Sequence, residues 1–446
     1  MKLFVPEPEI DLYNDGFVGH DLLGRAATGK QLSELVEKIQ DPIVIALDGA
    51  WGSGKSFFLK CWAGAHTVEN GGSAKVIYFD AFKHDFLDDP LVALTGVLAD
   101  RFSDKRSKAG KAVDAAKTAV TKLWRPALRV GVAAATASAS EIVGAIGNAA
   151  LNGTADELKA ASDEFWKKED GRRAAMREFG DALVKLTKSG EDESPQKIVI
   201  IIDELDRCRP DYALSLLEII KHFFAVDHVH FVLGINLKEF ECSVLSRYGE
   251  KIDAGIYLQK FIHLVLPITK KNLHLSGNSG SDYFEKILAN TAQSQYNLTQ
   301  NIVRYLRAMP HSNQISLRGA ERLFSKIAVI PEISNDNLDE CLALSGLMVL
   351  ELCRPDWIEN IKGRTLSHID ALNFFGLNEA DSKNSNPFRL TVYWIWRLTL
   401  DPEFLVQDEQ IAGGIPPGLN NSNMQRRRDL LPKLIDSHLK AFDLPW

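Results

Sequence analysis

The stretch that most constrains this chain is IALDGAWGSGKSFFLKCW, residues 45–62. It runs from an apolar β-branched segment, through a glycine-rich loop, into an amphipathic segment. Glycines let the backbone curl so that successive N–H groups point into one hollow, and a helix that starts there adds the positive end of its dipole. The loop also matches Gly-x-x-x-x-Gly-Lys-Ser, and a chance match in a chain of this length is about one in a hundred. The stretch therefore predicts a strand, a phosphate-binding loop and a helix.

Within this loop, the residue types indicate separate roles. Lys55 is expected to reach the β- and γ-phosphates of a nucleotide, and the hydroxyl of Ser56 is expected to ligate Mg²⁺. A glycine-rich turn that merely precedes a helix is the alternative, and the flanking strand and helix patterns disfavour it. The residues expected to contact the nucleotide are Gly49, Ala50, Trp51, Gly52, Ser53, Gly54, Lys55, Ser56 and Phe57.

Unbroken runs of Val, Ile and Leu predict a parallel sheet covered on both faces. Helical patterns between the runs, such as Pro90–Phe102 and Tyr212–Phe224, indicate right-handed crossovers and an α/β fold. The runs that predict strands are Pro42–Asp48, Ala74–Asp80, Gln196–Asp203, His228–Asn236 and Phe261–Ile268.

A second motif, KIVIIIDELDR, supplies the acids that a nucleotide hydrolase needs. Asp203 ends the most apolar strand, at the edge where ligands of parallel sheets bind, so it is the candidate Mg²⁺ ligand. Glu204 is the candidate that polarises the attacking water, and Asp206 is a second candidate for that role. Asn236 ends the next strand and is a candidate contact of the γ-phosphate or the water, although Asn also suits an ordinary turn.

Composition and spacing suggest how the chain is divided. Of the residues, 45% are apolar and 25% are charged, and the net charge of −7 argues against a broad surface for nucleic acid. Residues 1–103 and 195–270 are expected to form the α/β core. Residues 104–194 are expected to form a helical insertion, and residues 271–446 a helical lid and C-terminal domain.

Two features bear on location. The small-residue stretch 130–151 is interrupted by Glu141, so we expect helices packed through small faces rather than a membrane span. The five cysteines are scattered and form no C-x-x-C pair, which is typical of a reduced protein. The start of the sequence lacks the apolar core of a signal peptide, and a cytoplasmic location is expected.

The chain resembles the KAP family of P-loop NTPases in several stretches that keep the family's order, across residues 17–327. The glycine-rich loop is generic, but the whole set in this order is specific. The stretches are FVGHDLLGR, LDGAWGSGKSFF, IYFDAFKHDFLDDPLVALTGVL, IIIDELDRCRP, HFVLGINLKEFECSVLSRYG, YLQKFIHLVLPI and SLRGAERLFSKI.

This resemblance implies an ATPase of the additional-strand catalytic Glu type, with ATP and Mg²⁺ as ligands. It places the strand that ends at Asn236 between the P-loop strand and the strand that ends at Asp203. Lys55 and Ser56 take the Walker A roles and Asp203 the Walker B role, and Arg318 is a basic sensor on the helical lid. Asn236 stands where the family usually has Asp. The resemblance also implies a bacterial protein that acts in defence against phages or plasmids.

These features together predict a Mg²⁺-dependent ATPase that acts as a conformational switch or motor. The residues expected to take part in ATP hydrolysis are Glu204, Lys55, Asp206, Asn236 and Arg318. A homo-oligomer or a partner protein is expected, with an arginine finger from Arg207, Arg209, Arg318 or Arg322. Nothing in the sequence supports a nucleic-acid partner. Two alternatives stay open: a nucleotide-dependent scaffold with negligible turnover, and a phosphotransferase that acts on a small molecule.

Overall fold

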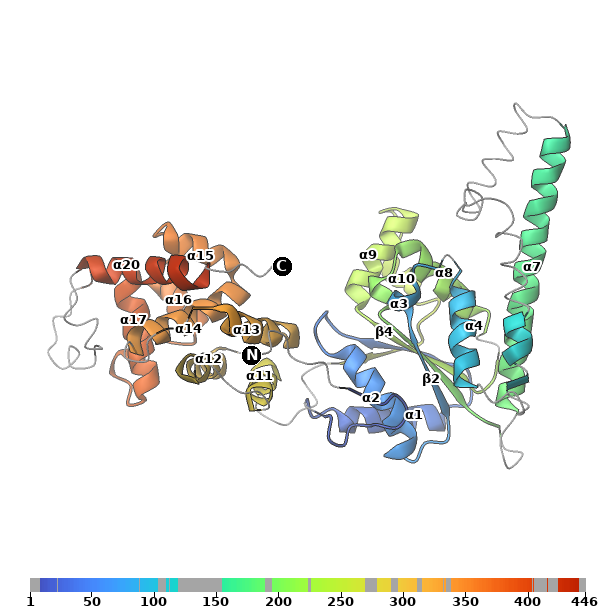
Figure 1. Cartoon of the computed structure of the whole chain (residues 1–446), viewed down its shortest axis with the longest axis horizontal. Helices are drawn as coiled ribbons and strands as arrows, with labels where there is room; N and C mark the ends of the chain where they lie inside the picture. Colours follow the sequence, from blue (N-terminus) through green and yellow to red (C-terminus); the bar gives the residue numbers. More distant parts are fainter. Residues whose placement is uncertain are drawn as a thin grey trace. The chain divides into compact units, whose positions relative to one another are not determined.

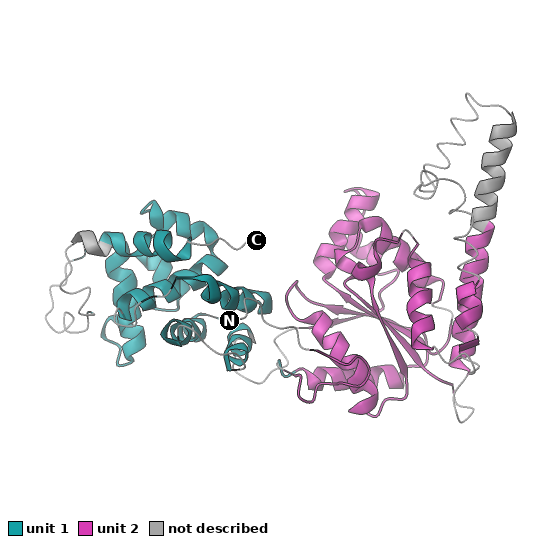
Figure 2. Ribbon diagram, viewed as in Figure 1, with its two compact units in different colours: residues 1–8, 22–24, 270–446 teal, residues 9–21, 25–269 magenta. Residues whose placement is uncertain are grey.

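A computed structural model describes most of the chain, in two compact units (Figure 2). One unit groups Glu9–Asp21 with Arg25–Thr269, and the other groups Lys270–Trp446 with Met1–Pro8 and Leu22–Gly24. The expected division into three domains stays a prediction. The described residues are 9–21, 23–87, 89–102, 110–111, 113–118, 155–188, 195–223, 226–268, 279–289, 296–310, 315–331, 333, 338–402, 404, 415 and 424–440.

The unit that contains Arg25–Thr269, magenta in Figure 2, is built on a five-stranded parallel sheet in the order β2-β3-β4-β1-β5 (Figure 1). The strand that precedes Asn236 lies between the P-loop strand and the strand that ends at Asp203, as the resemblance implied. This confirms the predicted α/β fold class. The strands are β1 Val44–Asp48, β2 Lys75–Asp80, β3 Ile198–Asp203, β4 Val229–Ile235 and β5 Leu264–Pro267.

Helices cover both faces of this sheet, which explains why its central strands are apolar throughout. Every residue of β3 and β4 is buried. In Figure 1, α1 and α2 lie on one side of the sheet, and α4, α8 and α7 lie on the other. The helices of this unit are α1 Ala26–Lys38, α2 Lys55–Val68, α3 Ala81–His84, α4 Pro90–Arg101, α7 Ala155–Thr187, α8 Pro210–Lys221, α9 Leu237–Tyr248 and α10 Ala254–Leu258, with the 3₁₀ turn η1 Leu205–Arg207.

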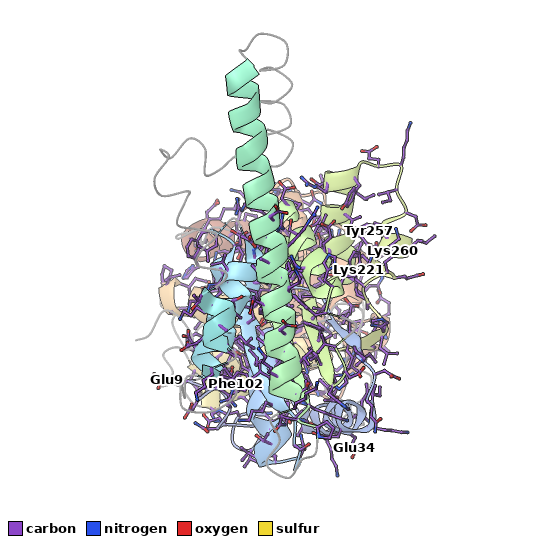
Figure 3. All side chains as sticks on the ribbon, turned by 90° about the vertical axis from the view of Figure 1, so that its right-hand side faces the viewer. Glu9, Glu34, Phe102, Lys221, Tyr257 and Lys260 are labelled. Carbon is purple, nitrogen blue, oxygen red and sulfur yellow. The ribbon has the colours of Figure 1, made fainter. Side chains whose placement is uncertain are left out.

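Part of the predicted helical insertion forms α7. Its apolar residues Phe179, Leu183 and Leu186 are buried in the core on the face of the sheet that α4 and α8 cover, and the ring centroids of Phe179 and Phe223 lie 4.7 Å apart. This part of α7 therefore belongs to the same core as α4 and α8. On the neighbouring surface, Lys260 lies over the ring of Tyr257 at 5.3 Å, and Lys221 lies nearby (Figure 3).

A polar cluster fixes α1 to α2 and so holds the helix that follows the P-loop. The Ser33 hydroxyl accepts from Trp62 Nε1 at 3.0 Å and lies 3.0 Å from His66 Nδ1, while His66 Nε2 lies 3.1 Å from Glu37. At the far end of α1, the Lys197 ammonium donates to the carbonyls of three residues, Val36, Glu37 and Ile39. These are the carbonyls that a helix leaves unpaired at its C-terminus, so Lys197 caps α1 against the sheet.

The unit that contains Lys270–Trp446, teal in Figure 2, is helical. Its core includes an aromatic cluster: Tyr393, Trp394 and Trp396 are buried, and Trp396 Nε1 donates to the hydroxyl of Tyr305 at 3.1 Å. Arg389 pairs with the buried carboxylate of Asp381. The helices are α11 Ser279–Ala289, α12 Tyr296–Ala308, α13 Leu317–Val329, α14 Leu338–Cys353, α15 Pro355–Lys362, α16 His368–Phe374, α17 Pro387–Leu400 and α20 Met424–Leu434, with the short turns η4 Glu379–Lys383 and η5 Ile435–Leu439.

Among the described helices, none combines the length and the apolar character that crossing a membrane requires. The small-residue stretch 130–151, for which the sequence predicted packed helices, lies outside the described residues.

His230 of β4 is fully buried, and neither ring nitrogen has a hydrogen-bond partner among the described residues. Burial, together with the charge of Lys197, lowers the pKa of His230 from 6.5 to about 4. Below pH 6.5 the unfolded imidazole takes up a proton that the folded one refuses until about pH 4. The stability contributed by the neutral ring is therefore present above pH 6.5 and is lost as the pH falls.

We predict that His230→Leu flattens this acid dependence. Between about pH 7.5 and about pH 5, the variant should lose roughly 2 kcal/mol less unfolding free energy than the wild type. At about pH 7.5 the two proteins should differ by under about 1 kcal/mol, because no hydrogen bond is lost. Urea unfolding followed by circular dichroism measures both values. Parallel pH curves for the two proteins would contradict the prediction.

Candidate functional site

The glycine-rich loop joins β1 to α2 with a backbone that only glycine adopts readily. Gly52 and Gly54 have φ of 74° and 81°, in the left-handed region. Gly54 is the N-cap of α2, which begins at Lys55. The α2 N-terminus and the curled loop therefore turn their N–H groups toward the same hollow, which is the arrangement of an anion-binding nest.

Two side chains of the loop carry polar groups suited to an anion. The Lys55 ammonium is buried and donates to the carbonyls of Gly49 at 2.6 Å and Ala50 at 3.4 Å. Burial lowers the pKa of Lys55, while the charge of Asp206 acts in the opposite direction. The buried Ser53 hydroxyl has no partner among the described residues. An unpaired hydroxyl and a buried ammonium both fit phosphate oxygens.

Asp203 ends β3 directly beside this loop. Its carboxylate accepts from the Tyr78 hydroxyl at 2.6 Å, and the Ser56 hydroxyl lies close to it. Burial raises the pKa of Asp203 to about 6, and the hydrogen bonds from Tyr78 and Ser56 act against this rise. On β4, a Cβ at Gly234 would lie 2.4 Å from Asp203 Oδ1, so the absence of a side chain there makes room for the carboxylate.

Glu204 follows Asp203 in a left-handed conformation, with φ of 58°, which is uncommon for a residue other than glycine. Its N–H donates to Asp203 Oδ1 at 2.9 Å. Its carboxylate accepts from the Ser56 hydroxyl at 3.3 Å and pairs with Arg207 at 3.0 Å. The left-handed turn therefore sends two adjacent acids toward one serine hydroxyl. Arg207, a candidate arginine finger, contacts the acid of its own chain.

Asp206 lies in the 3₁₀ turn η1 that follows, and it is buried. Its Oδ2 accepts from Trp51 Nε1 at 2.8 Å and from the backbone N–H of Asn236 at 3.0 Å. Thus Asn236, predicted as a side-chain contact of the nucleotide, touches the site through its main chain. Asp48 makes a similar link, because its Oδ1 accepts from the N–H of Leu237 at 2.9 Å.

The remaining predicted residues make other contacts or lie in the helical unit. Phe57 packs into the core between the sheet and α1. Arg209 pairs with Asp85 at 3.5 Å. Arg318 and Arg322 are exposed on α13 of the helical unit. The role of Arg318 at the nucleotide stays a prediction.

Sequence reasoning missed two residues at the site. Tyr78 is one, and no local signal marks it, because β2 and β3 are separated by the long insertion. Arg25 is the other: its Nη1 lies 3.4 Å from the carbonyl oxygen of Gly54, and burial lowers its pKa to about 10. Its backbone N–H donates to Asp21 at 2.8 Å, so the start of α1 is capped beside the P-loop.

The oxygens present also fit Mg²⁺. Mg²⁺ is usually held by one or two carboxylates together with substrate phosphates and water. Ser56 and Asp203 supply a hydroxyl and a carboxylate in contact. The described residues contain no group of three or more His, Cys, Asp or Glu that could hold a metal ion by themselves. The donor set therefore suits a metal that arrives with a nucleotide rather than a permanently bound one.

A comparison with protein families matches residues 25–334 to the KAP family P-loop domain. The chain belongs to this family. The matched segment of this KAP protein begins at Arg25 and includes the P-loop, the DELDR turn, Asn236 and Arg318. The predicted resemblance is thereby confirmed, and the protein is a P-loop NTPase of this family with a nucleotide-binding core.

Individual relatives add little to this. The KAP protein is 26% identical, over 162 residues, to the uncharacterized protein MJ0182 of Methanocaldococcus jannaschii. The aligned residues cover 33% of this chain and 83% of that protein. A solved structure of the Aeropyrum pernix ORC2 protein in ADPNP–ADP complexes is 11% identical, with a TM-score of 0.33 over 93% of this chain and 94% of that one.

Tyr78→Phe should destabilise the protein, because it removes the donor nearest to a buried carboxylate. A hydrogen bond to a charged group contributes roughly 1.5–3 kcal/mol, so the unfolding free energy should fall by about that amount. Tyr212→Phe is the matched control: its hydroxyl is buried in the same unit without a partner among the described residues. That variant should be as stable as the wild type. Equal losses in the two variants would show that the Tyr78–Asp203 bond has no special role.

Proposed function

We propose that this KAP protein is a Mg²⁺-dependent ATPase whose nucleotide state drives a conformational change. One observation carries the proposal: the Ser56 hydroxyl, directly after the P-loop lysine, donates to Glu204 at 3.3 Å and lies beside the carboxylate of Asp203. A metal ligand and a general base are needed at that point, and these two acids come from a strand far away in the sequence.

In the proposed complex, the N–H groups of the loop and the α2 N-terminus hold the phosphates. Lys55 turns from the carbonyls of Gly49 and Ala50 toward the β- and γ-phosphates, which exchanges neutral acceptors for charged ones. Ser56 and Asp203 would hold Mg²⁺, which neutralises charge on the phosphate oxygens when bound. Ser53 would pair its buried hydroxyl with a phosphate oxygen.

For hydrolysis, Glu204 is the proposed general base. Its carboxylate accepts a proton from water while the water oxygen attacks the γ-phosphorus, the bond to the β-phosphate oxygen breaks, and ADP leaves. The Ser56 oxygen would bind the metal through a lone pair, so its O–H can still donate to a carboxylate. Arg207, 3.0 Å from Glu204, would orient the Glu204 side chain.

Finer points of the proposal come from the family resemblance. Adenine as the base, Arg318 as a sensor, a homo-oligomer or a partner protein as the assembly, and defence against phages or plasmids are part of the proposal. A cytoplasmic place of action belongs with them. Arg318 is exposed on α13.

A scaffold that binds ATP without turning it over is the second candidate, and one observation favours it. Among the described residues, the Glu204 carboxylate contacts Ser56 and Arg207 of its own chain. If these contacts persist when ATP is bound, they would hold the carboxylate away from the attacking water. Nucleotide binding would then only hold the protein in a state that a partner recognises.

We predict that Lys55→Ala weakens ATP binding by about 100-fold, or roughly 3 kcal/mol, because a buried ammonium is removed from the phosphates. Calorimetric titration with a non-hydrolysable ATP analogue and Mg²⁺ measures the change. Lys60→Ala, one turn further along α2, is the control and should bind like the wild type. Unchanged affinity in Lys55→Ala would show that the nucleotide does not bind at this loop.

We also predict that Glu204→Gln keeps its affinity for ATP within about threefold but slows phosphate release by roughly 100- to 10,000-fold, the usual contribution of a general base. The amide can accept hydrogen bonds as the carboxylate does, but it cannot take the proton. Comparison of steady-state phosphate release with binding separates the two effects. If wild type and variant both release phosphate only at background rate while binding ATP, the scaffold is the correct function.

A further inference from the structure

Three acids follow one another in the DELDR turn, yet the third makes quite different contacts. Asp203 and Glu204 face Ser56, whereas Asp206 Oδ2 accepts from the indole of Trp51 and from the main chain of Asn236. Asp206 is 8% exposed, so these bonds form away from bulk water. Hydrogen bonds to an ionised acceptor are roughly twice as strong as neutral ones.

The three partners belong to loops that leave three neighbouring strands. Trp51 follows β1, Asp206 follows β3, and Asn236 follows β4, which lies between them in the sheet. One carboxylate oxygen therefore ties together the P-loop, the turn of the acids and the start of α9. Movement of any one of these loops along the edge of the sheet would break a bond to Asp206.

Trp51 shows what the tie does to the P-loop. Its side chain is 48% exposed, so burial of the ring does little to fix it, and the Nε1–H bond to Asp206 is its specific anchor. Trp51 directly precedes Gly52, where the backbone enters the left-handed conformation of the nest. An anchored Trp51 therefore fixes the direction from which the chain enters the phosphate-binding turn.

We propose that Asp206 is a positioning residue that holds the P-loop in its binding conformation through Trp51, and is not the group that activates water. The inference rests on the proposed function, since it concerns the same nucleotide site. Asp206 Oδ2 receives two donors from loops of the chain itself, so this oxygen serves the contacts between the loops. Glu204, whose carboxylate accepts from Ser56, keeps the proposed role of base.

A double-mutant cycle tests the proposal. Trp51→Phe removes the N–H and keeps an aromatic ring, Asp206→Ala removes the acceptor, and the third protein carries both changes. Trp51→Phe should weaken binding of a non-hydrolysable ATP analogue with Mg²⁺ by about tenfold, and Asp206→Ala by at least as much, because it also removes the acceptor of the Asn236 N–H. The double variant should bind no more weakly than Asp206→Ala, because both lack the bond to Trp51. Additive losses would overturn the proposal.

Asp206→Asn separates positioning from catalysis. The amide oxygen still accepts from Trp51, so this variant should keep affinity and turnover within about fivefold of the wild type, whereas Asp206→Ala should raise the dissociation constant. A general base behaves in the opposite way: Asp206→Asn would lose turnover by 100-fold or more while Trp51→Phe stays close to wild type. That result would overturn the positioning role.

Two controls separate the effect of the Trp51–Asp206 contact from unrelated effects of the substitutions. Trp357→Phe, in α15 of the helical unit, should leave nucleotide affinity unchanged. The same Trp51–Asp206 cycle measured by urea unfolding without nucleotide reports the contact alone. If the wild type binds no nucleotide, the proposed function fails and the unfolding cycle decides: coupling supports the tie between the loops, and additivity overturns it.

Discussion

The parallel register of β1, β4 and β3 is the constraint on which the site depends. Asp48 pairs with Ile235 across one strand boundary, and Gly234 pairs with Asp203 across the next. The three strands therefore end at the same level of the sheet, and their loops emerge side by side. Residues more than 140 positions apart in the sequence, such as Ser56 and Glu204, come within hydrogen-bonding distance for this reason. A slip of one residue would turn Asp203 to the other face.

Burial at this edge raises the energetic importance of every polar contact. Asp203 and Asp206 are buried acids, and Lys55 is the buried cation among them. Each charge is costly in such surroundings unless it is paired, so the fold pairs them with local donors: Tyr78 and Ser56 for Asp203, and Trp51 and Asn236 for Asp206. An arriving triphosphate would replace the internal carbonyl partners of Lys55. The fold thus prepares the site without needing the ligand to hold it open.

The fold was largely predictable from the sequence, and the site only in part. Runs such as KIVIIID must be covered on both faces, and the glycine pattern with Lys55 and Ser56 requires a strand before it and a helix after it. Side-chain partners over long separations leave no such mark: Tyr78 and Asp203 are 125 residues apart, and Trp51 and Asp206 are 155 apart. Asp206 and Glu204 could not be told apart in the sequence, because the left-handed backbone at Glu204 decides which way each acid faces.

That backbone turn explains how a short segment serves several purposes. A regular strand would point Asp203 and Glu204 to opposite faces of the sheet. With φ of 58° at Glu204, the chain instead doubles back, so that Glu204 joins Asp203 at Ser56 and the 3₁₀ turn delivers Asp206 to Trp51. A left-handed residue with a side chain costs about 1 kcal/mol or more, and glycine there would remove the cost but also the carboxylate. The strained position therefore carries the carboxylate that accepts from the Ser56 hydroxyl.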